Sequence, residues 1–179
     1  MIKCMNEEIL DIVDANEKVI GKIARKDTQR VITDKLGYIR VADLFLLNSE
    51  GRIWVPIRTA DKTIAPNGYD FSVGGHVESG DDYIQTLIRE TKEEINLDIT
   101  EKDIEFITKS TNEERHFIQS IYLLRTDVTP KFNPNDFTSA EWLKPSELIK
   151  SIDSGHLAKS NLRSSVLVLQ GYLNRTKEF

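Results

Sequence analysis

The sequence is poor in the residues that form disulfides and soft-metal sites. It has one cysteine, Cys4, and three histidines among 179 residues. A single cysteine excludes a disulfide within the chain and a cysteine-based zinc site. No apolar run approaches the ~20 residues of a membrane span. The amino terminus breaks into charge at once, which is unlike a signal peptide, so we expect a cytoplasmic protein.

Positive charge is not in excess either. Lys and Arg number 24 against 29 Asp and Glu, so the net charge is 24 − 29 = −5. Non-specific binding of nucleic acid requires an electropositive surface, so no stable nucleic-acid partner is expected. The composition, 39% hydrophobic and 30% charged, is ordinary for a globular protein. The length fits one domain with an extension.

Two hairpins are predicted in the first third of the chain. Residues 8–14 and 19–23 are apolar-rich and flank a polar turn. Residues 40–47 and 52–58 flank a turn rich in Asn, Ser and Gly. Pro56 has no backbone N–H, so its strand is expected at a sheet edge or at a bulge. Further strands are predicted at 71–73, 104–107, 117–124 and 141–143, and helices at 145–149 and 161–172. This order predicts a mixed sheet covered by helices.

Residues 81–95 are predicted to form an amphipathic helix. Its apolar positions at helical spacing are Ile84, Ile88, Thr91 and Ile95, with Leu87 beside them. Ser79 and Asp82 resemble a capping box at the start of the helix. Asn96 suits a left-handed C-cap at its end.

Three glutamates adjoin the apolar face of this helix. At 100° per residue, Glu90 and Glu94 fall together one turn apart, and Glu93 lies one residue's step further round. Like charges at this spacing repel, and a cation would relieve the repulsion. Carboxylate oxygens suit hard ions such as Mg²⁺ or Mn²⁺. Taken alone, such a run is more often a solvated acidic face of a helix.

With the loop before it, the helix resembles the Nudix box, the signature of the Nudix hydrolase family. The box has glycine, five residues, glutamate, seven residues and Arg-Glu, then an aliphatic residue, any residue, Glu-Glu, any residue, glycine and an aliphatic residue. The matching positions here, with no insertion, are Gly75, Asp81, Arg89, Glu90, Thr91, Glu93, Glu94, Asn96 and Leu97. Asp81 replaces a glutamate, Thr91 an aliphatic residue and Asn96 a glycine. None of the three is a metal-binding position of the box.

The resemblance implies a fold and a reaction. The fold is an α/β/α sandwich around a mixed β-sheet (class α/β, α+β), with a loop-helix-loop metal motif. The reaction is hydrolysis of a pyrophosphate bond in a nucleoside diphosphate linked to another group, with water attacking phosphorus and Mg²⁺ or Mn²⁺ as cofactor. Glu90, Glu93, Glu94 and the carbonyl of Gly75 would bind the metal, and Arg89 would orient a box carboxylate.

The resemblance leaves the proton acceptor and the domain limits as predictions. Glu93 or Glu94 is the favoured general base, and Glu113, Glu114 and Asp136 are alternatives. Residues 1–36 would form a strand-hairpin extension. Residues 37–179 would form the Nudix domain with its C-terminal helix, and the whole would be one compact unit.

A wider resemblance, over residues 7–145, is to the isopentenyl-diphosphate isomerase-like branch of the family. It is carried by segments 8–14 and 19–25, by Arg58 with Lys62 and Pro66, and by Gly74-Gly75-His76. Isomerases of this branch use a cysteine beside the glycine that precedes the histidine, and paired histidines upstream. The chain has no cysteine near Gly74 and no histidine before His76. Hydrolysis is therefore preferred to isomerisation.

Four further residues are candidates for contacting a small phosphate-containing substrate. Arg40, Arg58 and Lys62 would bind phosphates, although they are equally well explained as surface charges. His76 is a substrate contact or a polar loop residue. The alternative to a hydrolase is a catalytically silent nucleotide-binding Nudix domain. Dimers are frequent in such families, so a homodimer is a further expectation.

Overall fold

The computed structural model describes residues 7–176, so Cys4 lies outside the described residues. These residues form strands, α-helices and two short 3₁₀ segments. The strands are β1 (Ile9–Val13), β2 (Val19–Ala24), β3 (Ile39–Leu47), β4 (Ile53–Arg58), β5 (Val73–His76), β6 (Ile104–Asn112), β7 (Phe117–Arg125) and β8 (Phe137–Leu143). The α-helices are α1 (Gln29–Thr33), α2 (Tyr83–Ile95), α3 (Pro145–Asp153) and α4 (Leu162–Thr176), and the 3₁₀ segments are Arg25–Asp27 and Glu101–Asp103.

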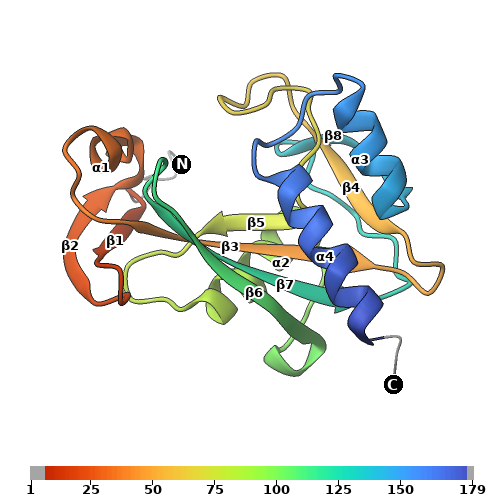
Figure 1. The fold of residues 1–179 in the computed structure, drawn as a ribbon, viewed down its shortest axis with the longest axis horizontal. Helices are drawn as coiled ribbons and strands as arrows, with labels where there is room; N and C mark the ends of the chain where they lie inside the picture. Colours follow the sequence, from red (N-terminus) through yellow and green to blue (C-terminus); the bar gives the residue numbers. More distant parts are fainter. Residues whose placement is uncertain (1–6, 177–179) are drawn as a thin grey trace, which may run out of the picture.

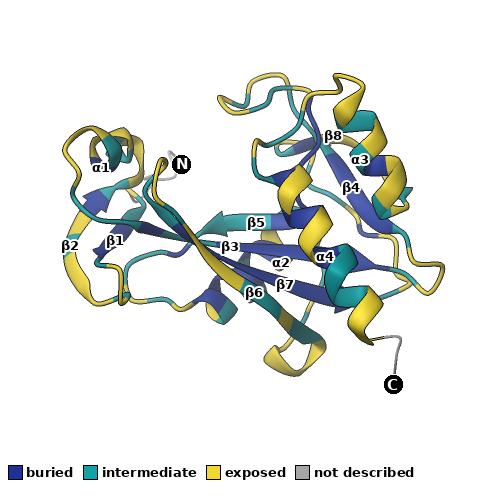
Figure 2. Cartoon of the chain, in the orientation of Figure 1, coloured by how far each residue is buried: buried dark blue, intermediate teal, exposed yellow. Residues whose placement is uncertain are grey.

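Six strands form one mixed sheet with helices on both faces (Figure 1). Its order is β6-β7-β3-β4-β8, and β5 also pairs with β3. The strand β3 runs parallel to β7 and antiparallel to β4 and β5. Figure 2 shows β3 and β7 buried along most of their length. The predicted α/β/α sandwich around a mixed sheet is confirmed.

Alternation along β3 divides the core into two layers. Ala42, Leu44 and Leu46 pack with residues of α2, while Phe45 and Leu47 pack with residues of α3 and α4. Successive side chains of a strand point to opposite faces, so this continuous apolar run serves both layers. The helix α2 therefore lies against one face of the central strand, and α4 against the other.

The edge of β3 opposite β7 is shared by two strands. Residues 41–44 pair with β5, whereas β4 pairs with β3 only at Leu47–Ile53. The prediction that 40–47 and 52–58 pair as a hairpin is therefore wrong beyond the turn, because the main partner of β4 is β8. The Pro56 carbonyl accepts a hydrogen bond from the Asp70 amide. The missing N–H of Pro56 therefore points to the side of β4 that β3 does not pair with at this position.

The first hairpin forms a separate two-stranded sheet, β1–β2, as predicted. Its core includes Leu10, Ile12, Val31 and Ile39. Val31 lies on α1, a five-residue helix that the sequence pattern did not predict. The short helix and β3 thus fix the hairpin to the rest of the molecule.

The ends of α2 follow from local side chains. Asp82 accepts a hydrogen bond from the Gln85 amide and Gln85 returns one, so the capping box is Asp82–Gln85 rather than the predicted Ser79–Asp82. Asn96 ends the helix in the left-handed conformation at φ 53°, as predicted. Of the predicted apolar positions, Leu87, Thr91 and Ile95 are buried and Ile84 and Ile88 are half-buried, and the buried face also includes Glu90. Among the described residues, no helix has the length and apolar character needed to cross a membrane.

Candidate active site

The site lies where α2 passes β5, and Gly75 allows the close approach. A Cβ atom on Gly75 would lie 2.6 Å from Glu90 Cδ and 2.9 Å from its Cγ. The Gly74 amide donates a hydrogen bond of 3.2 Å to Glu94 Oε2. The backbone of β5 therefore lies against both helix carboxylates, Glu90 at Gly75 and Glu94 at Gly74.

Burial makes these carboxylates harder to ionise. Glu90 is 9% exposed, and burial raises its pKa, with Arg89 opposing the shift and Glu93 adding to it. Burial also raises the pKa of Glu94 well above its usual range, and the charges of Glu90 and Asp70 add to this effect. Neighbouring carboxylates that raise one another's pKa favour the binding of a proton or another cation.

Arg89, the arginine of the box, forms an ion pair with the box carboxylate Glu90. Its guanidinium lies 2.9 Å from Glu90 Oε1 and 3.1 Å from Glu78 Oε1. Asp81 and Glu93 are more distant, at 3.9 and 3.7 Å. Arg89 therefore holds Glu90 by a charge-assisted hydrogen bond and connects it to the loop before α2. The orienting role of Arg89 stays a prediction.

Glu93 is the box glutamate that the structure keeps apart. Its side chain is 62% exposed and is turned toward Arg89. Within residues 7–176, no cluster of three or more His, Cys, Asp or Glu residues has the geometry to hold a metal ion. Glu90, Glu94 and the backbone of Gly75 are brought together, and Glu93 must turn inward to complete the predicted set. The donors are all hard oxygens, which fit Mg²⁺ or Mn²⁺ in type.

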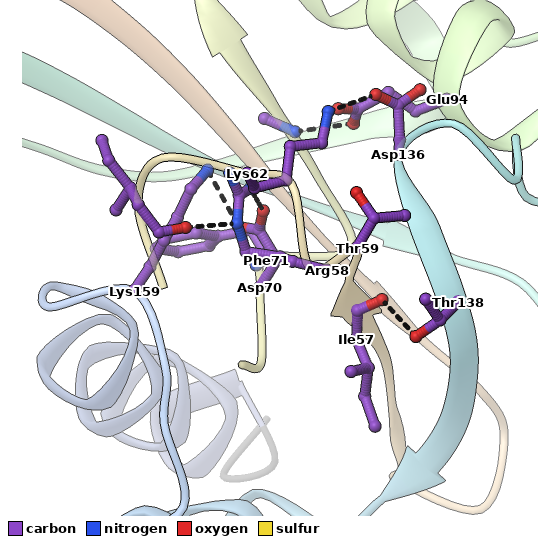
Figure 3. A network of polar contacts seen from close by, with 12 residues as sticks. Ile57, Arg58, Thr59, Lys62, Asp70, Phe71, Glu94, Asp136, Thr138 and Lys159 are labelled. Atoms are coloured by element: carbon purple, nitrogen blue, oxygen red, sulfur yellow. Dashed lines mark hydrogen bonds and ion pairs between the residues drawn. The ribbon is translucent and has the colours of Figure 1, made fainter. Parts of the chain in front are cut away.

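A second group of charges lies beside Glu94 (Figure 3). Asp70 is 4% exposed and pairs with both Arg58 and Lys159, the latter at 2.8 Å. Lys62 pairs with Asp136 at 2.6 Å. Arg58 and Lys62 are therefore near the box, but each is already bound to a carboxylate, and their binding of substrate phosphates stays a prediction.

The two remaining substrate candidates differ in their surroundings. Arg40 is largely buried and lies 3.3 Å from Asp11. Burial lowers the pKa of His76 to about 4, with the charges of Arg25 and Lys159 adding to the effect. His76 is thus neutral at pH 7 and offers ring nitrogens rather than a charge.

The structure separates the alternative proton acceptors. Asn133 donates to the carbonyl of Glu94 at 2.7 Å, which holds the segment carrying Asp136 against the end of α2. Glu113 instead binds the Tyr38 hydroxyl, at the turn between β6 and β7. Glu114 is exposed in the same turn. Of the three loop alternatives, Asp136 is the one placed beside the box.

Sequence reasoning missed a polar group on the α4 side of β3. Asp43 is 1% exposed and accepts a hydrogen bond of 2.6 Å from Gln119. Burial raises the pKa of Asp43 to about 6, and Lys159 opposes this shift. A single aspartate inside an otherwise apolar strand was the available signal for Asp43. Lys159 carried none, because it lies in the connection between α3 and α4.

Comparison with known proteins agrees with this geometry. The family model described as NUDIX domain matches residues 37–162. An uncharacterized Nudix hydrolase of Nostoc sp. (strain PCC 7120) is 41% identical over 158 residues, which are 87% of this chain and 91% of that protein. The chain belongs to the Nudix hydrolase family.

Three further matches, one to a curated protein and two to solved structures, agree with this family and fold. A Nudix hydrolase of Deinococcus radiodurans is 36% identical over 164 residues, covering 90% of this chain and 94% of that protein. The crystal structure of DR0079 from D. radiodurans has a TM-score of 0.79 at 36% identity, covering 89% of this chain and 97% of that chain. A Caenorhabditis elegans Ap4A hydrolase, with a TM-score of 0.54 at 19% identity, covers 75% of this chain and 98% of its own and shares the fold.

Proposed function

We propose that this Nudix hydrolase cleaves a pyrophosphate bond in a nucleoside diphosphate linked to another group, with water attacking phosphorus. The observation that carries the proposal is the pair of carboxylates, buried Glu90 and half-buried Glu94, that lie against the glycines of β5. Glu90, Glu93, Glu94 and the Gly75 carbonyl would hold Mg²⁺ or Mn²⁺. A divalent ion bound there supplies neutralisation of the pyrophosphate charge and a lowered pKa for bound water.

The other steps, which are to orient the carboxylates, accept a proton and bind the substrate, are assigned to side chains of the protein. Arg89 keeps the Glu90 carboxylate in place through the 2.9 Å contact. Glu93 or Glu94 accepts the proton of the attacking water, and Asp136 is the alternative. Lys62 is the predicted phosphate ligand best able to turn toward a substrate, because its side chain is 29% exposed whereas that of Arg58 is 12% exposed. His76 contributes a neutral hydrogen-bond partner.

The test is turnover on a panel of nucleoside diphosphate derivatives with Mg²⁺, with Mn²⁺ and with chelator. Glu93→Gln and Glu94→Gln should lose turnover and keep their circular dichroism spectra. Glu101→Gln is the matched control, because Glu101 is exposed and lies outside the box. Full activity in both box variants would contradict the proposal. Tight nucleotide binding in calorimetry without turnover would indicate the silent binding domain instead.

The relation to the isomerase-like branch predicts a negative result. No cysteine occurs near Gly74, so incubation with isopentenyl diphosphate should yield no isomer. Formation of the isomer would show that the missing cysteine is replaced by another group. A cytoplasmic location, a homodimer and the lack of a nucleic-acid partner stay predictions from composition and family.

A further inference from the structure

The hairpin β1–β2 contacts the loop that leads into α2. Ser79 donates a hydrogen bond of 2.8 Å to the Ile9 carbonyl, and Leu10 forms an antiparallel bridge with Glu78. Residues 78–81, which we call the entry loop, thus join β1 through one isolated bridge at Glu78 and then turn toward α2. The family box and the amino-terminal hairpin are therefore in direct backbone contact.

Two side chains fix the far end of the entry loop. Asp11 Oδ2 accepts hydrogen bonds of 3.3 Å from the Gly80 amide and from Arg40 Nη2. The same Nη2 donates a 3.3 Å bond to the Asp81 carbonyl. The Asp11 and Arg40 side chains are only 6% and 13% exposed. One carboxylate from β1 and one guanidinium from β3 thus hold an amide and a carbonyl of the loop.

The entry loop in turn contacts the box arginine. Glu78 lies 3.1 Å and Asp81 3.9 Å from the guanidinium of Arg89, which binds Glu90 at 2.9 Å. A shift of the loop would move two acids away from Arg89. The guanidinium of Arg89 would then shift relative to Glu90, and the Glu90 carboxylate, a proposed metal ligand, would shift with it.

We propose that Asp11 and Arg40 are positioning residues that set divalent-metal affinity through the entry loop and Arg89. The inference deepens the proposed function and rests on it. It also gives the hairpin a part in the site, and it gives Arg40 a role different from binding the substrate's phosphates. Groups that orient metal ligands typically change metal affinity by ~10–100-fold when removed. Because this pair acts through a further contact, about tenfold weaker binding is expected.

The main variant replaces both members of the pair, Asp11→Leu with Arg40→Met. Exchange of a buried ion pair for apolar side chains of similar volume is often neutral for stability. Gly80 is exposed, so water can replace the lost partner of its amide. The single variant Asp11→Asn is a second, nearly isosteric change. Asp14→Asn is the control, since Asp14 bonds only within the hairpin turn, at Asn16 and Lys18.

The readouts are Mn²⁺ affinity by calorimetry and amide exchange of Ser79 and Gly80 by NMR, both without substrate. We expect the double variant to bind Mn²⁺ about tenfold more weakly and to exchange these amides faster, with Asp14→Asn like wild type. Excess Mn²⁺ should restore its turnover. A raised KM that excess Mn²⁺ does not correct would instead show that Arg40 binds the substrate, and would overturn the inference.

Failure of the inference and failure of the proposed function give different results. If wild type binds Mn²⁺ and both Asp11 variants bind it equally well, the positioning role is wrong and the proposed function stands. If wild type binds no Mn²⁺, both are overturned.

Discussion

Replacement of Gly75 by alanine tests the approach of α2 to β5 with a single methyl group. The new Cβ would lie 2.6 Å from Glu90 Cδ and 2.9 Å from Cγ. Carbon atoms in contact ordinarily stand about 3.5–4.0 Å apart, so the Glu90 carboxylate must move by about 1 Å. The glutamate is 9% exposed and has little room to move. Overpacking of this kind costs about 1–3 kcal/mol of stability.

A displacement of ~1 Å in a positioned catalytic group reduces turnover by ~10²-fold. We therefore expect Gly75→Ala to fold, to melt a few degrees lower, with each kcal/mol worth about 2–4 °C at this size, and to lose about 10²-fold in kcat. Thermal unfolding and steady-state kinetics measure these two losses, and Mn²⁺ calorimetry reports whether metal affinity falls with them. Gly21→Ala is the matched control, because its Cβ would stand an ordinary 3.6 Å from Ile12 Cδ1. Wild-type metal affinity and turnover in Gly75→Ala would refute the reasoning.

Two further predictions concern stability. Burial raises the pKa of Asp43 from 3.8 to about 6, so its charged form is disfavoured in the folded state. The free energy of unfolding of Asp43→Asn should thus gain about 3 kcal/mol relative to that of wild type as the pH rises from 4 to above 6. A difference between the two proteins that stays constant with pH in urea titrations would contradict this prediction. Asn96→Ala should cost about 1 kcal/mol in thermal unfolding because of its left-handed conformation, while Asn96→Gly should not.

The features predicted correctly from sequence are those fixed by neighbours along the chain. The first hairpin, the start of α3 at Pro145 and the left-handed cap at Asn96 depend on residues a few positions apart. Helical geometry also predicted Glu90 and Glu94 one turn apart on one flank of α2, with Glu93 within reach of that flank. In the structure the Glu93 side chain is 62% exposed and turned toward Arg89, and the metal-binding role of all three stays a prediction.

The features that sequence did not predict depend on distant residues. The partner of β4 is β8, some 80 positions later, because β5 occupies the edge of β3 that a simple hairpin would use. The carboxylates that hold Arg58 and Lys62 are 12 and 74 positions away. The sequence identified Arg58 and Lys62 as candidate phosphate ligands, but it did not show that each forms an ion pair with a carboxylate. The short helix α1 was not predicted because only one of its five residues, Val31, has a buried side chain, which leaves no apolar periodicity in the sequence.

The distribution of charge around Glu94 shows where an incoming cation would be bound most strongly. Arg89 pairs with Glu90, Lys62 with Asp136, and Arg58 and Lys159 with Asp70. Within residues 7–176, no cation forms an ion pair with Glu94, whose side chain accepts its hydrogen bond from the Gly74 amide. Buried carboxylates without a counter-charge are costly, and here the charges of Glu90 and Asp70 add to the cost. Because every neighbouring cation is bound elsewhere, a divalent ion would bring the charge that Glu94 lacks.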